Sequence, residues 1–240
     1  MNLHNKTAII TGGTKGIGKA IAENLLYEDA NIVVAARTES ELDNIKSQFK
    51  TKNNFMAIKC DVTCIDDVKE LMKKTLSTYG TIDILVNNVG KAYIGPISKM
   101  SNDDWNDIIT TNLTSVFLCC KEVIPIMEKQ KSGYIINIVS NSGKSGTANF
   151  AAYCASKFGE IGFTQSLFQE LKASGIKVVA ICPGGVDTTL WKNVQDDPSI
   201  KPKKGKSMSA KNVAQVVNFI LNNDEIIFVE PIFLPSSLYY

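Results

Sequence analysis

Tyr153 and Lys157, four positions apart, are the residues of this sequence whose types and spacing best suit proton transfer. In a helix, positions i and i+4 lie on one face, so the phenol and the ammonium would share a site. A nearby cation favours the phenolate and lowers the tyrosine pKa from its usual value of about 10. We therefore expect Tyr153 to act as a general acid and base near neutral pH.

Ser140 is a third candidate, because it follows the apolar run Tyr134–Val139 directly. If that run is a strand and the next segment a helix, Ser140 and Tyr153 meet at the same edge of a sheet. A hydroxyl there can hold a substrate carbonyl oxygen. Each feature alone also fits a structural role, as a turn serine or a chance Tyr-x-x-x-Lys spacing, so the combination carries the hypothesis.

A glycine-rich turn, Thr11–Gly18 (TGGTKGIG), lies between a short apolar run and a helical pattern. Glycines let the backbone turn sharply and approach a pyrophosphate, and the following helix N-terminus supplies free N–H groups. The spacing is G-x-x-x-G-x-G, which differs from the general dinucleotide fingerprint G-x-G-x-x-G. The residues expected to bind a dinucleotide here are Gly12, Thr14, Lys15, Gly16, Ile17 and Gly18.

Arg37 follows the second apolar run, at the place where NAD-binding folds carry an acidic residue for the ribose 2′-hydroxyl. No acidic residue occurs there before Glu39, and Lys15 in the glycine turn adds a second cation. Two cations suit a 2′-phosphate, with the arginine able to bind it in a fork. The sequence therefore predicts NADP(H) in preference to NAD(H), the alternative being two solvated surface charges.

These residues need elements to position them, and strand-like and helix-like segments alternate along the chain. The expected strands cover 7–11, 31–35, 55–59, 82–86, 134–139, 177–181 and 226–229. The expected helices cover 17–26, about 40–50 with Ser40 as N-cap, 65–78, 103–131 with a kink near Pro125, 152–173 and 209–221. The strands are continuously apolar, as in a parallel sheet that is covered on both faces.

We therefore expect one α/β domain over residues 1–240, a single-domain Rossmann fold. Its sheet would be a doubly wound, seven-stranded parallel one with helices on both faces. A polar stretch rich in Pro, Gly and Lys, 187–208, is expected to be a mobile substrate loop.

Composition excludes several classes of protein. A net charge of +2 and 44% hydrophobic residues argue against disorder and against a nucleic-acid partner. We expect no apolar run that approaches the roughly 18 residues of a membrane span, and no signal peptide is apparent, so we expect a cytoplasmic protein. The six cysteines form no CxxC pair and are expected to be buried free thiols. His4 is the only histidine, which argues against a Ser-His-Asp triad and a metal site.

Taken together, the motifs resemble the short-chain dehydrogenase/reductase family over nearly the whole chain. The family's Asn-Asn-Ala-Gly signature appears as Asn87–Gly90, with Val89 in place of alanine. The resemblance implies a catalytic set of Asn112, Ser140, Tyr153 and Lys157. It implies further cofactor contacts from Asp61, Val62, Asn88, Gly90, Tyr153, Lys157, Pro183, Gly184, Val186 and Thr188.

The resemblance also implies a reaction, the interconversion of a ketone and a secondary alcohol by hydride transfer with NADP(H). Tyr153 would exchange the proton, Ser140 would hold the oxygen, and Lys157 would lower the tyrosine pKa and bind the nicotinamide ribose. Asn112 would hold a water that resupplies protons through Lys157. The family commonly forms tetramers through two long helices, so a homotetramer or homodimer is expected, with Phe117, Phe163 and Phe168 facing a partner or the sheet.

Within the family the sequence is most similar to the 3-oxoacyl-[acyl-carrier-protein] reductase group, which implies a carbonyl or alcohol substrate that can be acyl-carrier-linked. The lysines of 201–206 would attract an acidic carrier, or are simply solvated. The ending 230–240 looks more like relatives that act on small ketones or hydroxy acids. A non-catalytic NADP-binding sensor or scaffold and a sugar-nucleotide epimerase are weaker alternatives. Candidate pocket residues are Tyr93, Ile94, Phe150 and Trp191.

Overall fold

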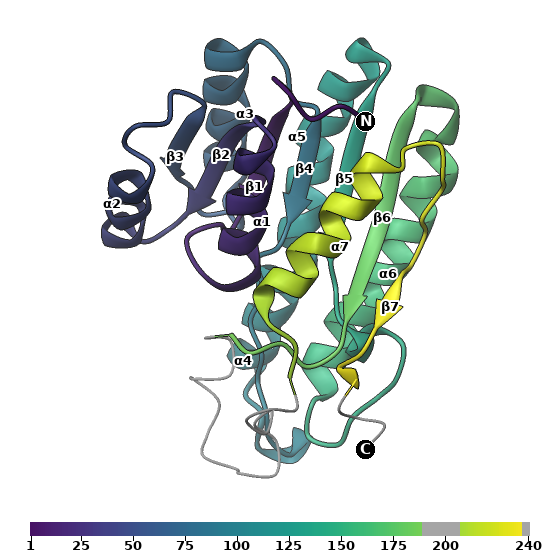
Figure 1. Ribbon diagram of the computed structural model, residues 1–240. Helices are drawn as coiled ribbons and strands as arrows, with labels where there is room; N and C mark the ends of the chain where they lie inside the picture. Colours follow the sequence, from purple (N-terminus) through teal and green to yellow (C-terminus); the bar gives the residue numbers. More distant parts are fainter. Residues whose placement is uncertain (189–206, 237–240) are drawn as a thin grey trace.

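Seven parallel strands form one sheet in the order β3-β2-β1-β4-β5-β6-β7 (Figure 1). The computed structural model describes residues 1–188 and 207–236. The expected parallel, doubly wound architecture is confirmed. The strands are β1 (Thr7–Thr11), β2 (Asn31–Ala36), β3 (Phe55–Lys59), β4 (Ile84–Asn87), β5 (Gly133–Ile138), β6 (Ile176–Pro183) and β7 (Ile232–Phe233).

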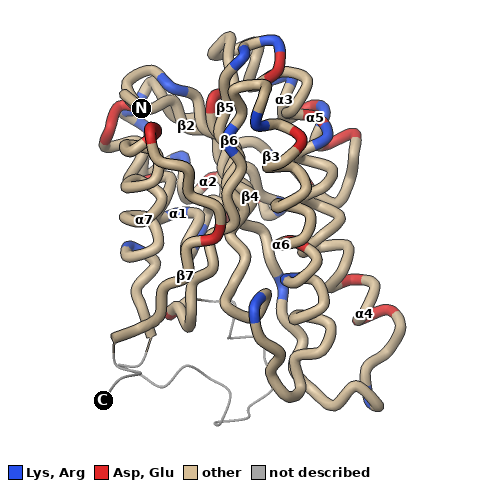
Figure 2. The backbone as a smooth tube through the Cα atoms, turned by 90° about the vertical axis from the view of Figure 1, so that its right-hand side faces the viewer, with Lys and Arg blue, Asp and Glu red and all other residues tan. Residues whose placement is uncertain are grey.

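Two layers of helices enclose the sheet, as the edge-on view in Figure 2 shows. Alternate residues of β1 point to opposite faces, so Ile10 packs in one core and Ile9 in the other. One layer holds α1 (Gly16–Tyr27), α2 (Glu39–Gln48) and α7 (Ala210–Asn222). The other holds α3 (Ile65–Tyr79), α5 (Ser115–Gln130) and α6 (Ala151–Leu171).

The strand order reverses at β1, which pairs with β2 on one side and with β4 on the other. Parallel α/β sheets bind ligands outside the carboxyl ends of their strands at such a point. The glycine turn follows β1, Arg37 follows β2, Asn88 follows β4 and Ser140 lies just past β5. The fold therefore brings the predicted chemical groups to one edge.

The expected helix over 103–131 is divided. It consists of α4 (Asn102–Ile109), a π-helical turn at Thr110–Thr114, and α5, which contains Pro125. Short 3₁₀ turns lie at Ile97–Lys99, Asn141–Gly143 and Lys172–Ser174. The N-cap of α2 is Thr38 rather than Ser40.

The seventh strand lies later than expected. Its position over 226–229 was wrong, because β7 covers only Ile232–Phe233. The chain joins the sheet edge at Val229, whose carbonyl accepts from the Ala180 N–H, and Pro231 accepts from Cys182. Proline has no N–H to donate, so the ladder is weakened there, as at many edge strands.

The expected substrate loop lies mostly outside the described residues, which omit 189–206 and with them 201–206 and Trp191. Its two ends meet, because the Asp187 N–H donates to the Met208 carbonyl at 2.9 Å.

One expectation from composition fails. The helical run Asn102–Gln130 is long and apolar enough, by length and composition, to span a membrane, with a mean hydropathy of 1.2. This is weak evidence, since core helices of soluble proteins pass the same test, and α5 packs on the sheet through Val116 and Val123. All six cysteines are free, and five are buried as expected, while Cys64 is exposed before α3.

Candidate active site

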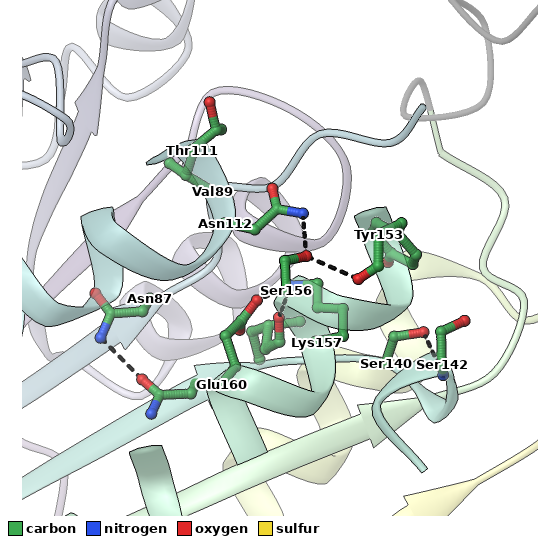
Figure 3. A network of polar contacts seen from close by, with 12 residues as sticks. Asn87, Val89, Thr111, Asn112, Ser140, Ser142, Tyr153, Ser156, Lys157 and Glu160 are labelled. Atoms are coloured by element: carbon green, nitrogen blue, oxygen red, sulfur yellow. Dashed lines mark hydrogen bonds and ion pairs between the residues drawn. The ribbon is translucent and has the colours of Figure 1, made fainter. Parts of the chain in front are cut away.

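Helix α6 presents Tyr153 and Lys157 on one face, as their spacing predicts (Figure 3). Both side chains are buried, and the Lys157 Nζ lies 5.9 Å from the centroid of the Tyr153 ring. The ring of Phe150 packs edge-on against Tyr153 with centroids 6.2 Å apart. The phenol and the ammonium therefore share one buried site.

Ser140 reaches the same site from the end of β5. Its hydroxyl caps the 3₁₀ turn Asn141–Gly143 by accepting from the Ser142 N–H at 3.1 Å. The hydroxyl also donates to the Asn141 side-chain oxygen at 3.2 Å. The turn thus fixes Ser140 beside the N-terminal part of α6.

The pKa of the Tyr153 phenol lies above its usual value, as the net result of opposing effects. Burial raises the pKa of the Tyr153 phenol, while the Lys157 ammonium and a hydrogen bond with Ser140 lower it; Glu160 raises it again, and the net direction is upward. Lys157 thus lowers the Tyr153 pKa as expected, but burial is the larger effect and leaves the pKa above its usual value.

Glu160, a residue that the sequence interpretation missed, binds the lysine. Its Oε1 lies 2.6 Å from the Lys157 Nζ, and both side chains are almost fully buried. The same ammonium donates to the Ile138 carbonyl at 3.3 Å. Burial raises the pKa of Glu160 to about 7, against the pull of Lys157. Burial also disfavours the Lys157 ammonium, yet the charge of Glu160 leaves the lysine pKa raised.

Asn112 lies in the π-helical turn and is fully buried. Its Oδ1 accepts from the Lys91 N–H at 2.8 Å, and its Nδ2 donates to the Lys91 carbonyl and to Ser156 Oγ, each at 2.9 Å. The side chain thus ties the segment after β4 to α6. Because its amide is engaged in these bonds, the Asn112 side chain supports the residues of the site and does not itself face the cleft.

A cleft of about 620 Å³ opens at the carboxyl ends of the strands, with the glycine turn as one wall. Gly12 adopts φ +63°, which side-chain-bearing residues rarely do. A Cβ at Gly18 would lie 2.5 Å from Asn88 Nδ2 and 2.6 Å from the Gly12 carbonyl. The Asn88 amide donates to the Thr11 carbonyl at 3.0 Å and so ties the turn to β4.

The two cations predicted for the cofactor, Lys15 and Arg37, line this cleft, and each faces a carboxylate. Lys15 Nζ lies 2.8 Å from Glu41 Oε1, and Thr14 donates to the other oxygen of Glu41 at 2.7 Å. The bond from Lys15 lowers the Glu41 pKa, followed by the bond from Thr14. Arg37 Nη1 lies 3.8 Å from Asp61 Oδ2.

Asp61 is held in place by its own loop. Burial opposes ionisation of Asp61, but hydrogen bonds from the Thr63 hydroxyl and N–H and the charge of Arg37 leave its pKa lowered. The hydroxyl bond is 2.7 Å long and the N–H bond is 3.0 Å. An ionised carboxylate therefore lines the cleft next to Arg37.

Comparison with known proteins decides the family. The family model described as short chain dehydrogenase matches residues 6–199. The chain belongs to the short-chain dehydrogenase family. It is an oxidoreductase of that family, and the resemblance read from its motifs is confirmed.

Curated relatives in the short-chain dehydrogenase family cover most of the chain. The 3-oxoacyl-[acyl-carrier-protein] reductase FabG of Salmonella typhimurium is 34% identical over 228 residues, 93% of each chain. The enzyme of the same name from Vibrio cholerae is 38% identical over 197 residues, 82% of this chain and 80% of its own.

Solved structures agree on the short-chain dehydrogenase fold. A variant of the actinorhodin polyketide ketoreductase, solved with NADPH, has a TM-score of 0.88 at 29% identity and covers 98% of both chains. The protein gox2181 has a TM-score of 0.89 at 27% identity, covering 96% of this chain and 95% of its own.

Most residues expected from the short-chain dehydrogenase motifs line the cleft. They are Gly12, Thr14, Lys15, Gly16, Ile17, Arg37, Asp61, Val62, Asn88, Gly90, Ser140, Tyr153, Lys157, Pro183, Gly184, Val186 and Thr188. Gly18 and Asn112 lie behind it. Tyr93 lines the cleft as well, while Ile94 packs with Phe150 against Tyr153.

The cleft fits a dinucleotide by its own geometry. Helix α1 begins at Gly16, and no side chain caps its first turn, so the N–H groups there are available to an anion. The Gly12 conformation brings the backbone close to the cleft without a side chain. No group of three metal-ligating side chains occurs in 1–188 or 207–236.

Proposed function

We propose that the protein is an NADP(H)-dependent ketoreductase that interconverts a ketone and a secondary alcohol, with Tyr153 as the general acid and base. The observation that carries the proposal is the buried Tyr153 phenol between Ser140 and Lys157 at the cleft that the glycine turn forms. A tyrosine, a serine hydroxyl and a lysine together supply what carbonyl reduction needs from a protein, a proton and a polarised oxygen.

Two observations support NADP(H) as the cofactor, namely the residues of the cleft and a solved relative. When bound, NADP(H) supplies the hydride. The α1 N-terminus would bind its pyrophosphate, and Lys15 and Arg37 would bind the 2′-phosphate in place of their present carboxylate partners. The actinorhodin ketoreductase relative, solved with NADPH, supports this choice.

The chain's own residues would handle the proton. In the reducing direction the Tyr153 O–H bond breaks, and the proton passes to the carbonyl oxygen that the Ser140 hydroxyl holds. Lys157 stabilises the resulting phenolate by its charge. Asn112 would hold a water of the proton relay, although its side chain is already bonded to Lys91 and Ser156.

The best-supported substrate is a 3-oxoacyl thioester, including one linked to an acyl carrier, since the relatives from Salmonella and Vibrio are 3-oxoacyl-[acyl-carrier-protein] reductases. A reductase of small ketones or hydroxy acids is the second candidate. The ending 230–240 favours it, because this ending looks more like that of relatives acting on such substrates. The described part of the ending lies next to a cleft residue, since the Gly184 N–H donates to the Phe233 carbonyl at 2.8 Å.

The proposal also covers the compartment and the oligomeric state of the enzyme. Six free cysteines suit a reducing compartment, so we place the enzyme in the cytoplasm. Phe117 on α5 and Phe158 on α6 are almost half exposed, whereas Phe163 and Phe168 pack against the core. The exposed pair favours a homotetramer or homodimer formed through these two helices.

The test is NADPH consumption against 3-oxoacyl thioesters, small ketones, quinones and aldehydes, with NADH as the alternative cofactor. We expect turnover of the 3-oxoacyl substrate with NADPH, lost by about 10²- to 10⁴-fold in Tyr153→Phe. Turnover of small ketones alone would support the second candidate. Tight NADPH binding without turnover of any carbonyl would contradict the ketoreductase and favour a non-catalytic NADP-binding protein.

A further inference from the structure

Glu160 places a carboxylate in the interior of the site, one helical turn beyond Lys157 (Figure 3). Its Oε1 lies 2.6 Å from the Lys157 Nζ, with 1% of its side chain exposed against 3% for the lysine. That oxygen accepts no other hydrogen bond within the described part of the chain. Such a charge is costly to bury, and a buried carboxylate oxygen whose one partner is an ammonium is expected to act on that partner.

Other charges around α6 are neutralised or turned outward. From β6 the Cys182 thiol faces the pair, and Tyr153 and Cys154 lie on α6 itself. From the 3₁₀ turn after β5, Lys144 is ion-paired with Glu230.

The remaining elements around α6 add no charge to the interior. From β5, the neutral amide of Asn137 reaches Thr164 of α6, and from the π-helical turn Asn112 reaches Ser156. On α4, Asp103 and Asp104 are exposed, and Asp107 pairs with Lys91. Glu160 and Lys157 thus form a nearly isolated pair.

The isolated pair of Glu160 and Lys157 affects the ionisation of the Tyr153 phenol. A lone lysine ammonium would stabilise a Tyr153 phenolate, but a carboxylate in contact with it cancels much of that field. Burial is the largest effect that raises the Tyr153 pKa, and beside it Lys157 favours the phenolate while Glu160 opposes it. The phenol form is the one that donates a proton in carbonyl reduction, and the phenolate accepts it in alcohol oxidation.

We propose that Glu160 is a positioning residue that binds the Lys157 ammonium and keeps Tyr153 protonated, so that the site favours carbonyl reduction over alcohol oxidation. The proposal rests on the proposed function, because it assigns a direction to the same chemistry. Glu160 touches neither substrate nor cofactor in this scheme and acts through Lys157.

The experiment compares the wild type with Glu160→Gln, which keeps the shape and removes the charge. Glu170→Gln, on the exposed face of the same helix, is the matched control. Tyrosinate absorbance is titrated from about pH 8 to 12, around the ordinary tyrosine pKa. Subtracting the curve of Tyr153→Phe isolates the Tyr153 step from the other six tyrosines. The pH profiles of alcohol oxidation and carbonyl reduction are measured on the same variants.

We expect the Tyr153 midpoint to fall by about one pH unit in Glu160→Gln, a tenfold rise in the phenolate fraction at fixed pH. The oxidation profile should move to lower pH by the same amount, and Glu160→Asp should restore part of the wild-type profile. Glu170→Gln should match the wild type. Coinciding midpoints in the wild type and Glu160→Gln would overturn the proposal.

If Glu160→Gln does not fold, as judged by circular dichroism, the same titration is made on Glu160→Leu and Glu160→Asp, and an unshifted midpoint in the leucine variant counts against the proposal. If the wild type reduces no carbonyl, the proposed function fails, while the tyrosinate titration still decides whether Glu160 holds Tyr153 protonated.

Discussion

Lys15 and Glu41 both line the cofactor cleft and form an ion pair, with Nζ and Oε1 2.8 Å apart. Lys15 comes from the glycine turn and Glu41 from the first turn of α2. The cation that the sequence assigns to a 2′-phosphate is therefore already partnered by the chain. Binding a phosphate there requires the lysine to exchange one anion for another, which reduces the gain in affinity.

Removing the Glu41 charge should tighten NADPH binding. In Glu41→Gln, Lys15 no longer has a competing anion, and a half-exposed ion pair contributes about 0.2–1 kcal/mol, so Kd should fall about 1.5- to 5-fold. NADH binding should not change, since it has no 2′-phosphate. The measurement is a fluorescence titration with both cofactors, with Asp43→Asn on the exposed side of α2 as the control. An unchanged NADPH Kd would show that Lys15 does not reach the phosphate.

Arg37 should determine the cofactor preference more strongly than Lys15. Hydrogen bonds to a charged group contribute about 1.5–3 kcal/mol, so Arg37→Ala should raise the KM for NADPH about 10- to 150-fold. Its present partner, Asp61, is 3.8 Å away, a looser contact than that of Lys15. The ratio of kcat/KM for NADPH and NADH is the readout, and Lys46→Ala on α2 serves as the control cation. A ratio equal to that of the wild type contradicts the assignment of the 2′-phosphate site.

The chemistry at the strand ends could be predicted from the sequence because it depends on local pattern. Continuous apolar runs mark strands covered on both faces, and the polar residues that follow them must share one edge. Tyr153 and Lys157 lie on one helical face for the same local reason.

Features that depend on tertiary contact could not be predicted in this way. A glutamate such as Glu160 ordinarily faces solvent, and only the packing of α6 on the sheet shows that it is buried. Its spacing of three from Lys157 and seven from Tyr153 was the available signal. The late position of β7 likewise depends on the fit of Val229 and Pro231 to the edge of β6.

The contact between Gly18 and Asn88 predicts a sharp steric effect in the glycine turn. In Gly18→Ala the new methyl group would lie 2.5 Å from Asn88 Nδ2 and 2.6 Å from the Gly12 carbonyl, which is backbone. We expect a loss of stability of about 1–3 kcal/mol and weaker NADPH binding. Gly146→Ala is the matched control, because a Cβ there has no neighbour within 4 Å. Equal melting temperatures of the two variants would refute the packing argument.

Exposed aromatic side chains on α5 and α6 predict that the protein self-associates. Phe117 and Phe158 are 44% and 47% exposed, although they lie on long helices that otherwise pack on the sheet. A charge placed in a buried interface is costly, so Phe158→Asp should yield smaller particles in size-exclusion chromatography with light scattering. Tyr27→Asp, on an exposed residue of α1, is the control. A wild-type protein that elutes as a monomer would contradict the prediction.

Glu160 also predicts how stability depends on pH. Burial raises its pKa from the unfolded value of 4.5 to about 7 in the folded chain, so the folded state binds the proton more tightly between these values. The free energy of unfolding therefore falls as pH rises through this window, by an amount on the order of 3 kcal/mol, because ionised Glu160 is held in the interior. Lys157 stays charged throughout, since its own pKa is raised. Urea unfolding of the wild type and Glu160→Gln at several pH values tests this. As pH rises, Glu160→Gln should become more stable relative to the wild type. Glu170→Gln should follow the wild type. Parallel curves for the wild type and Glu160→Gln would mean that Glu160 does not titrate in this range.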